Sequence, residues 1–260
     1  MKYFVADAFT DVPFQGNPAG VCLTERELPD ELMQRIAAEN GLPETAFLRR
    51  TAEGWHIRWF TPAFEMDLCG HATLASGFVL LEHVTPDAGE IVFSSRSGRL
   101  RVSRDGAMYT LDFPARPPQP CPVPEGLAEA LGARVTECAL SRDLVTVLES
   151  AEAVRALAPD FVRMRTIPNL PPVVVTAAGD DCDFVSRYFD VHDAIIEDPV
   201  TGSAHCSLAP FWSGRLGKDT LLARQLSLRG GTLRCRVDGG RVFISGSAVL
   251  YLRGEIVAPA

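Results

Sequence analysis

Apolar and polar residues alternate along much of the chain in patterns that predict short strands. Alternation, or a run rich in β-branched and aromatic residues, is typical of strands. Such segments lie at residues 1–10, 44–48, 55–60, 144–148, 173–177 and 184–189. Residues 91–113 indicate three strands separated by Ser97-Gly98 and Asp105-Gly106, and hairpins return from residue 225 onward. Strands in this number, mixed with helices, predict an α/β (α+β) protein.

Four segments predict helices. Residues 29–40 carry an apolar stripe that includes Leu32 and Ile36, and Asn40-Gly41 predicts a left-handed cap at its end. Residues 72–81 form the longest apolar run and predict a helix that opens at the polar turn before them. Shorter helices are expected at residues 125–131 and 151–158.

The two halves of the chain share a short motif. Arg58-Trp59-Phe60 leads to Gly70-His71-Ala72, and Arg187-Tyr188-Phe189 leads to Gly202-Ser203-Ala204. The interval from arginine to glycine is 12 positions (70 − 58) in one copy and 15 positions (202 − 187) in the other. The two glycines lie 132 positions apart (202 − 70). Three matched letters can recur by chance, but the repeat favours two pseudo-symmetric domains, each delivering a helix start.

Composition places these domains in a protein with a large core. Of the 260 residues 47% are hydrophobic, which suits two ordinary domains or one large domain. Six prolines stiffen residues 114–124, so we expect an N-terminal domain at residues 1–115 and a C-terminal domain at residues 116–247. The C-terminal strand near residues 248–260 could return to the first domain. The formal charge of −8 argues against nucleic acid or an anionic membrane as a partner.

The seven cysteines indicate a reducing compartment. Their number is odd, and none forms a Cys-x-x-Cys pair. The first residues meet an acid, Asp7, too early for the apolar segment of a signal peptide, and the run at residues 72–81 is too short to span a bilayer. We therefore expect a cytoplasmic protein with free thiols.

Two glycine turns are the strongest candidates for a binding site. A helix start presents backbone N–H groups and a partial positive charge, which suit a carboxylate or phosphate. Gly70 and Gly202 would let a ligand approach this backbone closely. Two such helix starts facing one cleft would suit a small acid, whereas the plainer alternative is that both glycines only shape tight turns.

Three side chains near these turns offer acid–base chemistry. His71 is either a catalytic or binding group, or a capping or packing residue. Glu44, at the start of an apolar strand, is either a solvated strand end or an acid whose raised pKa suits proton transfer. Asp198, before Pro199, is either an N-cap or a substrate contact.

Other chemistries lack their motifs. The chain has no phosphate-binding Gly-rich loop with lysine, no Gly-x-Gly-x-x-Gly after a strand and no Gly-x-Ser-x-Gly. Its five histidines show no metal-ligand spacing. These exclusions favour a proton-transfer enzyme that needs neither a cofactor nor a metal.

Four motifs in order resemble those of one known family. They are Phe14-Gln15-Gly16-Asn17-Pro18-Ala19, Pro43-Glu44-Thr45-Ala46-Phe47, Cys69-Gly70-His71-Ala72-Thr73 and Glu197-Asp198-Pro199-Val200-Thr201-Gly202-Ser203-Ala204. Together they resemble the motif set of the PhzF-like (phenazine biosynthesis) family. The resemblance implies the diaminopimelate-epimerase-like fold: two similar domains, each a curled, mostly antiparallel sheet around a central helix, with the active site between them. It also implies a homodimer, no cofactor and a small carboxylate or amino-acid-like substrate.

The resemblance further implies roles for individual residues. Glu44 would move a proton from one substrate carbon to another. The residues it assigns to catalysis are Glu44, His71 and Asp198, and those it assigns to substrate binding are Asn17, Gly70, His71, Thr201, Gly202 and Ser203. The expected activity is that of a cofactor-independent isomerase that works by general acid–base catalysis.

Departures from related proteins leave alternatives open. The related epimerases carry a cysteine before each glycine, but here Cys69 precedes Gly70 and Thr201 precedes Gly202. A two-thiol racemase is therefore disfavoured, although a racemase or epimerase that uses Cys69 remains an alternative. So does a non-catalytic protein that binds small metabolites. Gly20 stands where the family more often has a larger apolar residue, and the chain is somewhat short, which leaves the substrate and any part in phenazine metabolism open.

Overall fold

The computed structural model describes residues 1–193 and 195–257 and divides the chain into two compact units. Unit 1 comprises residues 1–112 together with the C-terminal segment from Ile244, and unit 2 comprises Phe113–Phe243. The change from unit 1 to unit 2 falls at Phe113, one residue before the proline-rich segment begins. Two strands, β8 (Met108–Pro114) and β17 (Arg241–Gly246), carry the chain across the boundary.

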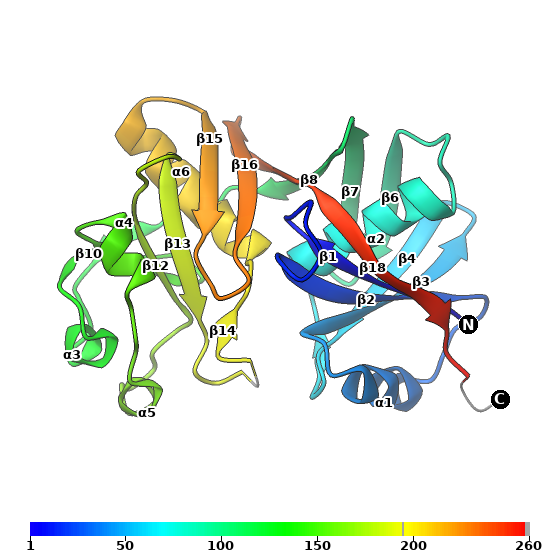
Figure 1. The fold of residues 1–260 in the computed structure, drawn as a ribbon, viewed down its shortest axis with the longest axis horizontal. Coiled ribbons are helices and arrows are strands. Elements are labelled where there is room, and N and C mark those ends of the chain that lie inside the picture. The colour runs from blue at the N-terminus through cyan, green and yellow to red at the C-terminus, as the bar shows by residue number, and fades with distance from the viewer. Residues whose placement is uncertain (194, 258–260) are drawn as a thin grey trace. The chain divides into compact units, whose positions relative to one another are not determined.

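Unit 1 is a mostly antiparallel sheet with one helix on each face (Figure 1). In sheet order its strands are β18–β1–β2–β3–β4–β6–β7–β8, and only the β2–β3 and β4–β6 pairs are parallel among the pairings described. Besides β8, its elements are β1 (Lys2–Ala8), β2 (Asn17–Thr24), α1 (Asp30–Asn40), β3 (Glu44–Thr51), β4 (Gly54–Phe60), β5 (Glu65–Met66), α2 (Gly70–His83), β6 (Glu90–Ser95), β7 (Gly98–Asp105) and β18 (Ala248–Glu255).

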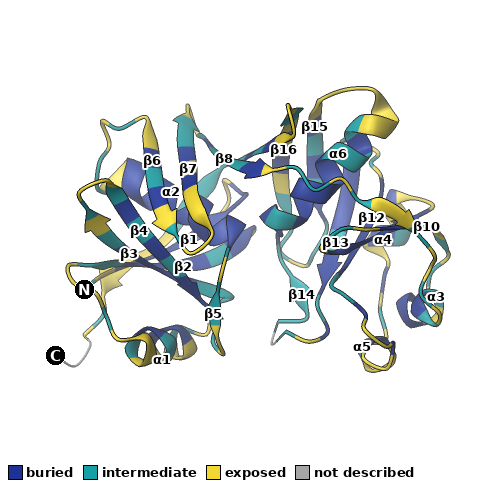
Figure 2. Ribbon diagram, turned by 180° about the vertical axis from the view of Figure 1, so that it is seen from behind, coloured by how far each residue is buried: buried dark blue, intermediate teal, exposed yellow. Residues whose placement is uncertain are grey.

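Helix α2 is the central helix of unit 1. It contacts β1, β2, β3, β6, β7 and β18, and every residue from Gly70 to Leu81 is buried (Figure 2). An apolar body explains this position, since a helix without a polar face must be enclosed. Two of its hydroxyl groups bond to backbone carbonyls one turn earlier: Thr73 Oγ1 donates to the Cys69 carbonyl at 2.5 Å, and Ser76 Oγ to the Ala72 carbonyl at 2.6 Å.

Helix α1 covers the opposite face of the sheet. Its Met33 and Ile36 pack into a cluster with residues of β1 and β3, among them Phe47, while its outer face is exposed (Figure 2). The helix ends as predicted at Gly41, which has a φ of 61°. A left-handed residue at this position lets the chain turn directly into β3.

Unit 2 repeats this architecture. Its strands run β9–β10–β11–β12–β13–β15–β16, with parallel pairs at β11–β12 and β13–β15. Besides β17, its elements are β9 (Gln119–Cys121), α3 (Leu127–Leu131), β10 (Val135–Leu140), β11 (Leu144–Leu148), α4 (Ala151–Arg155), α5 (Phe161–Met164), β12 (Val173–Ala178), β13 (Phe184–Phe189), β14 (Glu197–Asp198), the 3₁₀-helix η1 (Gly202–Ala204), α6 (His205–Leu216), β15 (Thr220–Gln225) and β16 (Gly231–Asp238).

The helices of unit 2 occupy corresponding places. Helix α6 contacts β15 and β16, whereas α4 contacts β11, β12 and β13. Leu148, Val154 and Phe189 belong to the core cluster on the α4 side. The helix expected to start at Gly202 begins as one 3₁₀ turn and continues as α6, a common way for an α-helix to open.

Strand registers match between the two units. Phe60 of β4 lies opposite Glu65 of β5, and Phe189 of β13 lies opposite Glu197 of β14. The chain covers five positions (65 − 60) between these partners in unit 1 and eight (197 − 189) in unit 2. The three-residue insertion inferred from the sequence repeat therefore lies between β13 and β14. The architecture predicted from the sequence, two similar domains that each hold a central helix against a mostly antiparallel sheet, is confirmed.

Several elements were not predicted, and two general features agree with expectation. Strands β10 and β15 and helix α5 fell in segments without clear periodicity. All seven cysteines are free thiols. Within the described residues, no helix is long and apolar enough to cross a membrane.

Candidate active site

Three elements of unit 1 bring four polar side chains together. Asn17 is the first residue of β2 and Glu44 is the first residue of β3. Because these strands are parallel and Ala19 lies opposite Glu44, both residues are at the same edge of the sheet. Cys69 immediately precedes α2, and His71 is its second residue. The central helix therefore starts where the two strands begin.

His71 contacts each of the other three side chains of this cluster. Its Nε2 lies 3.1 Å from Glu44 Oε2. Its Nδ1 lies 3.0 Å from Asn17 Nδ2 and 3.6 Å from Cys69 Sγ. The carboxylate thus meets one ring nitrogen, and the amide and the thiol meet the other.

The cluster is almost shielded from solvent. The side chain of His71 is 4% exposed and that of Glu44 is 14% exposed. Although Glu44 Oε2 and His71 Nε2 are in ion-pair contact, neither forms a well-aligned hydrogen bond among the described residues. A buried donor and acceptor held close without a good bond are suited to a third polar group.

The proton on His71 faces Glu44. Burial lowers the pKa of His71, but Cys69 and Glu44 outweigh burial and hold that pKa well above 6.5. Burial also raises the pKa of the Cys69 thiol. A charged ring conflicts with an Asn17 amide that donates to Nδ1, which suits the uncharged ring. Nε2 carries a proton toward Glu44 both in the charged ring and in the uncharged ring that accepts at Nδ1.

The same cluster contains side chains of the kinds that bind metal ions. Glu44, Cys69 and His71 offer an oxygen, a sulfur and a nitrogen that lie within 4.8 Å of one another. Zinc accepts such donors. The thiol, however, contacts Nδ1 and the carboxylate contacts Nε2, whereas one ion would take only one ring nitrogen. The contacts suit a chain of proton donors and acceptors better than a metal centre.

Gly70 opens α2 beside this cluster. The first backbone bond at the start of the helix runs from Thr73 N to the Cys69 carbonyl at 3.2 Å. The N–H groups of the preceding turn have no acceptor within the helix, so they can serve an anionic ligand. These N–H groups lie next to the Glu44–His71 pair.

Unit 2 presents a different set of polar groups at its helix start. Asp198 accepts a hydrogen bond from Thr201 Oγ1 at 2.5 Å. Gln225, which the sequence did not single out, accepts from Thr201 N at 2.8 Å and donates to the Asp198 carbonyl at 2.7 Å. Its side chain holds the turn from Asp198 to Gly202 in shape.

Ser203 has a charged neighbour that was also missed. Arg142 Nη2 donates to Ser203 Oγ at 2.9 Å, and the guanidinium forms two further bonds to Asp143 at 2.9 Å. Asp143 is fully buried and accepts from Tyr188 at 3.3 Å. An Arg-Asp pair before the apolar run 144–148 was the only available signal in the sequence.

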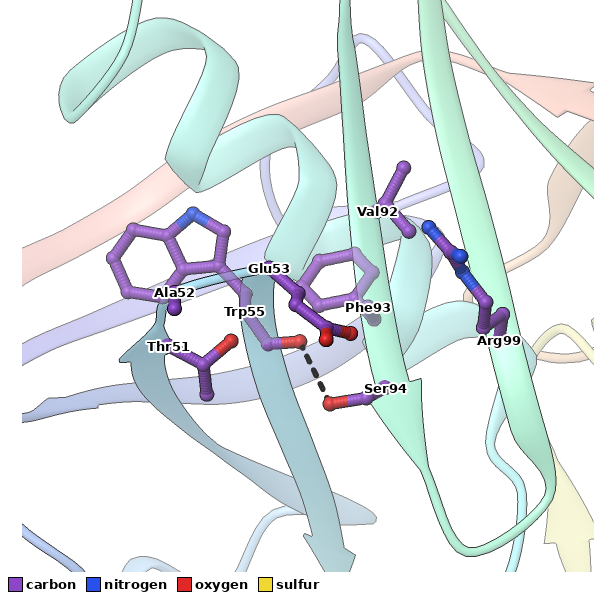
Figure 3. Close-up of a pocket in the computed structure, with 8 residues that line it drawn as sticks. All are labelled: Thr51, Ala52, Glu53, Trp55, Val92, Phe93, Ser94 and Arg99. Atoms are coloured by element: carbon purple, nitrogen blue, oxygen red, sulfur yellow. Dashed lines mark hydrogen bonds between the residues drawn. The ribbon is translucent and has the colours of Figure 1, made fainter.

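A pocket elsewhere in unit 1 contains none of the predicted site residues (Figure 3). It lies at the β3–β4 turn, where Trp55 and Arg99 contribute to its wall and Ser94 Oγ donates to the Trp55 carbonyl at 3.4 Å. A hollow alone does not define a catalytic site. The side chains of unit 1 that were singled out for acid–base chemistry lie instead at the buried cluster around His71.

Comparison with known proteins agrees with this picture. The profile of the family described as "Phenazine biosynthesis-like protein" matches residues 6–254. An uncharacterized isomerase of Pseudomonas aeruginosa is 50% identical over 98% of this chain and 98% of its own. A crystal structure of a PhzF-family phenazine biosynthesis protein from Enterococcus faecalis is 45% identical, covers 99% of both chains and has a TM-score of 0.96.

A more distant structure shares the fold alone. A hydroxyproline epimerase from Agrobacterium vitis is 13% identical, covers 98% of this chain and 90% of its own, and has a TM-score of 0.63. Fold and relatives together define the class of protein: an enzyme, and an isomerase. The chain belongs to the phenazine biosynthesis-like (PhzF-like) family, as its motifs predicted.

Proposed function

We propose that this isomerase moves a proton within a small carboxylate or amino-acid-like substrate without a cofactor, and that Glu44 is its acid and base. The observation that carries the proposal is the buried contact of 3.1 Å between Glu44 Oε2 and His71 Nε2. A carboxylate shielded from water and faced by an N–H is poised to take a proton and to return it.

The neighbours of Glu44 divide the remaining tasks. As Glu44 takes a proton from a substrate carbon, its charge is neutralised, and His71 Nε2–H keeps the carboxyl group oriented. Asn17 and the Cys69 thiol hold the ring from the side of Nδ1. Glu44 then delivers the proton to a second carbon, which completes an isomerisation with no net change in atoms or electrons.

Binding of the substrate carboxylate is assigned to the helix starts. The backbone at Gly70, beside Glu44, offers donors in a region of partial positive charge. Asp198, Thr201, Gly202 and Ser203 form the second set of proposed contacts, as the resemblance predicted. The regular bonding of Asp198 to Thr201 supports a pre-organised turn in unit 2.

Solvent-exchange measurements test the proposal. The protein is incubated in deuterium oxide with a panel of small cyclic and linear amino acids and unsaturated carboxylic acids, and deuterium in each compound is followed by NMR. The active compound should gain deuterium with wild-type protein and not with Glu44→Gln. Glu44→Asp, which shortens the side chain but keeps the acid, serves as the matched control and should retain slow exchange. Full turnover by Glu44→Gln would show that the base is another residue.

One observation favours a second candidate, an epimerase that uses Cys69. The Cys69 sulfur lies 3.6 Å from His71 Nδ1, within reach of proton transfer. Burial raises the pKa of the thiol, which opposes formation of the thiolate, so we rank this candidate second. Cys69→Ser abolishing turnover while Glu44→Gln spares it would reverse the order.

Three further properties stay open to experiment. A homodimeric state is expected from the resemblance, a cytoplasmic location is expected from the cysteines and the first residues of the chain, and a part in phenazine metabolism is left open. Light scattering of the purified protein measures the first. A substrate identified by the exchange assay decides the last.

A further inference from the structure

An arginine–glutamate pair ties down the segment that leads into α2. Arg58 Nε and Nη2 donate to the two carboxylate oxygens of Glu65 at 2.7 and 2.8 Å. Both side chains are only 13% exposed. Two parallel, partly buried bonds fix orientation as well as distance. Glu65 lies five positions before Gly70 (70 − 65), so its bonds to Arg58 fix the beginning of the segment that leads into α2.

A serine holds the same segment two residues further on. Ser97 Oγ, from the β6–β7 turn, donates to the Asp67 carbonyl at 2.8 Å. Arg58, Glu65 and Ser97 together are called the unit 1 anchor. After Asp67 only Leu68 separates the anchored segment from Cys69, so the anchor ends directly before the helix start that carries His71.

The same anchor occurs in unit 2. Arg187 donates to both oxygens of Glu197 at 2.7 and 3.0 Å, and Ser227 Oγ donates to the Pro199 carbonyl at 2.7 Å. The positions correspond: Glu65 and Asp67 precede Gly70 by five and three residues, as Glu197 and Pro199 precede Gly202. Arg187, Glu197 and Ser227 are called the unit 2 anchor.

The aromatic neighbours of the two arginines correspond as well. The Arg58 guanidinium lies 5.2 Å from the ring centre of Phe60, and that of Arg187 lies 5.1 Å from the ring centre of Phe189. The serines also match by register, because Trp55 pairs with Phe93 in unit 1 as Phe184 pairs with Ala223 in unit 2. Ser97 and Ser227 each follow these last residues by four positions.

We propose that the unit 1 anchor consists of positioning residues, which set the start of α2 so that His71 meets Glu44. The inference rests on the proposed function, since it explains how the Glu44–His71 contact is maintained. The two units share the Arg–Glu bonds and the serine bond to the backbone, although their side chains at the helix start differ. This correspondence points to control of the path of the loop. Loosening Arg58 or Ser97 displaces His71 without removing any group that touches the substrate.

Each unit contains a histidine that reports on its own anchor. In unit 1, His71 is two residues past Cys69. In unit 2, His205 Nδ1 bonds to the Thr201 carbonyl at 2.9 Å and is fully buried. The ring nitrogens of these histidines can be observed by NMR in protein labelled with ¹⁵N-histidine, and His71→Gln and His205→Gln identify the two sets of signals.

The test changes each anchor in turn and measures the ring signals of both histidines. Ser97→Ala and Arg58→Lys remove one hydroxyl or one forked contact in unit 1, and Ser227→Ala and Arg187→Lys do the same in unit 2. The unit 1 variants should shift the ring signals of His71 and leave those of His205 in place, and the unit 2 variants should do the reverse. Unchanged His71 signals in folded Ser97→Ala and Arg58→Lys proteins would overturn the inference. So would His71 signals that shift equally in all four variants, because that result indicates a general loss of stability.

Kinetics supply an independent readout once a substrate is known. Displacement of a catalytic pair by a fraction of an ångström to one ångström lowers kcat by roughly ten- to a hundredfold. The unit 1 variants should therefore lower kcat with little change in KM, whereas the unit 2 variants should mainly raise KM. A rise in KM alone in the unit 1 variants contradicts the inference. If the proposed role of Glu44 is wrong, Glu44→Gln keeps its activity while the NMR shifts persist, so the two failures can be told apart.

Discussion

The two helix starts share one scaffold and carry different chemistry. In each unit a short strand, an Arg–Glu pair and a serine lead the chain into the helix. At the helix itself Cys69 corresponds to Thr201, and His71 to Ser203. By register Pro172 is the counterpart of Glu44, because Thr45 pairs with Phe60 as Val173 pairs with Phe189. Unit 2 thus lacks both the carboxylate and the imidazole of unit 1.

The difference shows that the backbone path into the helix is repeated in the two units, whereas the side chains at the helix start are not. The backbone path is maintained twice by similar bonds, since a helix start must be held firmly to offer its N–H groups. In unit 1 Glu44 and His71 are buried against each other, whereas the corresponding positions of unit 2 hold Pro172 and Ser203. The proposed enzyme therefore needs one proton-transfer centre and has no counterpart of it in unit 2.

The largest expected effect is the loss of this centre. Glu44→Gln should lower kcat by roughly 10²–10⁴-fold, the usual contribution of a general acid–base group. Thr201→Cys added to this variant reproduces the two-thiol pattern of related epimerases and should not restore turnover. Recovery of activity in the double variant would mean that the two helix starts are chemically more alike than we propose.

A second prediction contrasts the buried histidines of the two units. Burial lowers the pKa of His205 to about 4, against the opposing effect of its bond to Thr201. The unfolded chain binds this proton near pH 6.5 and the folded chain does not, so stability falls as the pH drops from about 6.5 to 4. The free energy of unfolding should decrease by roughly 3 kcal/mol over this window.

Urea titrations at several pH values measure this decrease. His205→Leu removes the titrating ring, so the decrease specific to His205 should vanish. The variant should start from a lower stability at neutral pH, because the bond to Thr201 is lost. His56→Leu, at an exposed hydrogen-bonded histidine in unit 1, serves as a control. An equal acid-induced decrease in wild-type and His205→Leu proteins would contradict the prediction.

A third prediction concerns the packing of the central helices. Gly77 and Ala209 occupy matching positions, seven residues after Gly70 and Gly202 (77 − 70 and 209 − 202). A Cβ at Gly77 would lie 2.4 Å from Val102 Cγ1. Gly77→Ala should therefore destabilise the protein by about 1–3 kcal/mol, even though alanine favours helices.

The matched variant sharpens this comparison. Ala209→Gly in α6 should cost about 1 kcal/mol, chiefly through helix propensity. Thermal unfolding of both variants supplies the measurement. If Gly77→Ala stabilised the protein, Val102 and β7 would move away from the added methyl group at little cost in free energy.

The smallest expected effect is a change in the titration of His71. Glu44 helps to hold the pKa of His71 well above 6.5 against burial. Glu44→Gln should lower that pKa, because the neutral amide no longer favours the charged ring. Titration of the His71 ring by NMR tests the shift, with Glu197→Gln in unit 2 as the control that should leave it unchanged.

Much of the fold followed from local patterns. The helix at residues 29–40 ends at Gly41 as predicted, and the three strands of residues 91–113 turn at both predicted dipeptides. Strands β10 and β15 escaped because their segments are short and carry polar residues, and their pairing depends on distant neighbours. Periodicity reveals which face of a helix or strand is apolar. It does not reveal a strand whose formation depends on pairing with residues distant in the sequence.

The candidate site was predictable only in part. Asn17, Glu44 and His71 were singled out from the sequence, and the structure brings these three together. The same motifs could not reveal that Cys69 lies at the opposite ring nitrogen from Glu44. Gln225 and Arg142 were missed because each supports the site from a strand end that is remote in sequence.

The sequence by itself determined the family, the two-fold repeat and the run of helices and strands, since these depend on residue order and periodicity. Tertiary structure alone decided which polar groups come into contact. Glu44 and His71 are 27 positions apart (71 − 44), and they meet because the parallel register of β2 and β3 and the docking of α2 place them at one buried edge. The protonation of His71 and Cys69 follows from that burial and contact, which residue order does not contain.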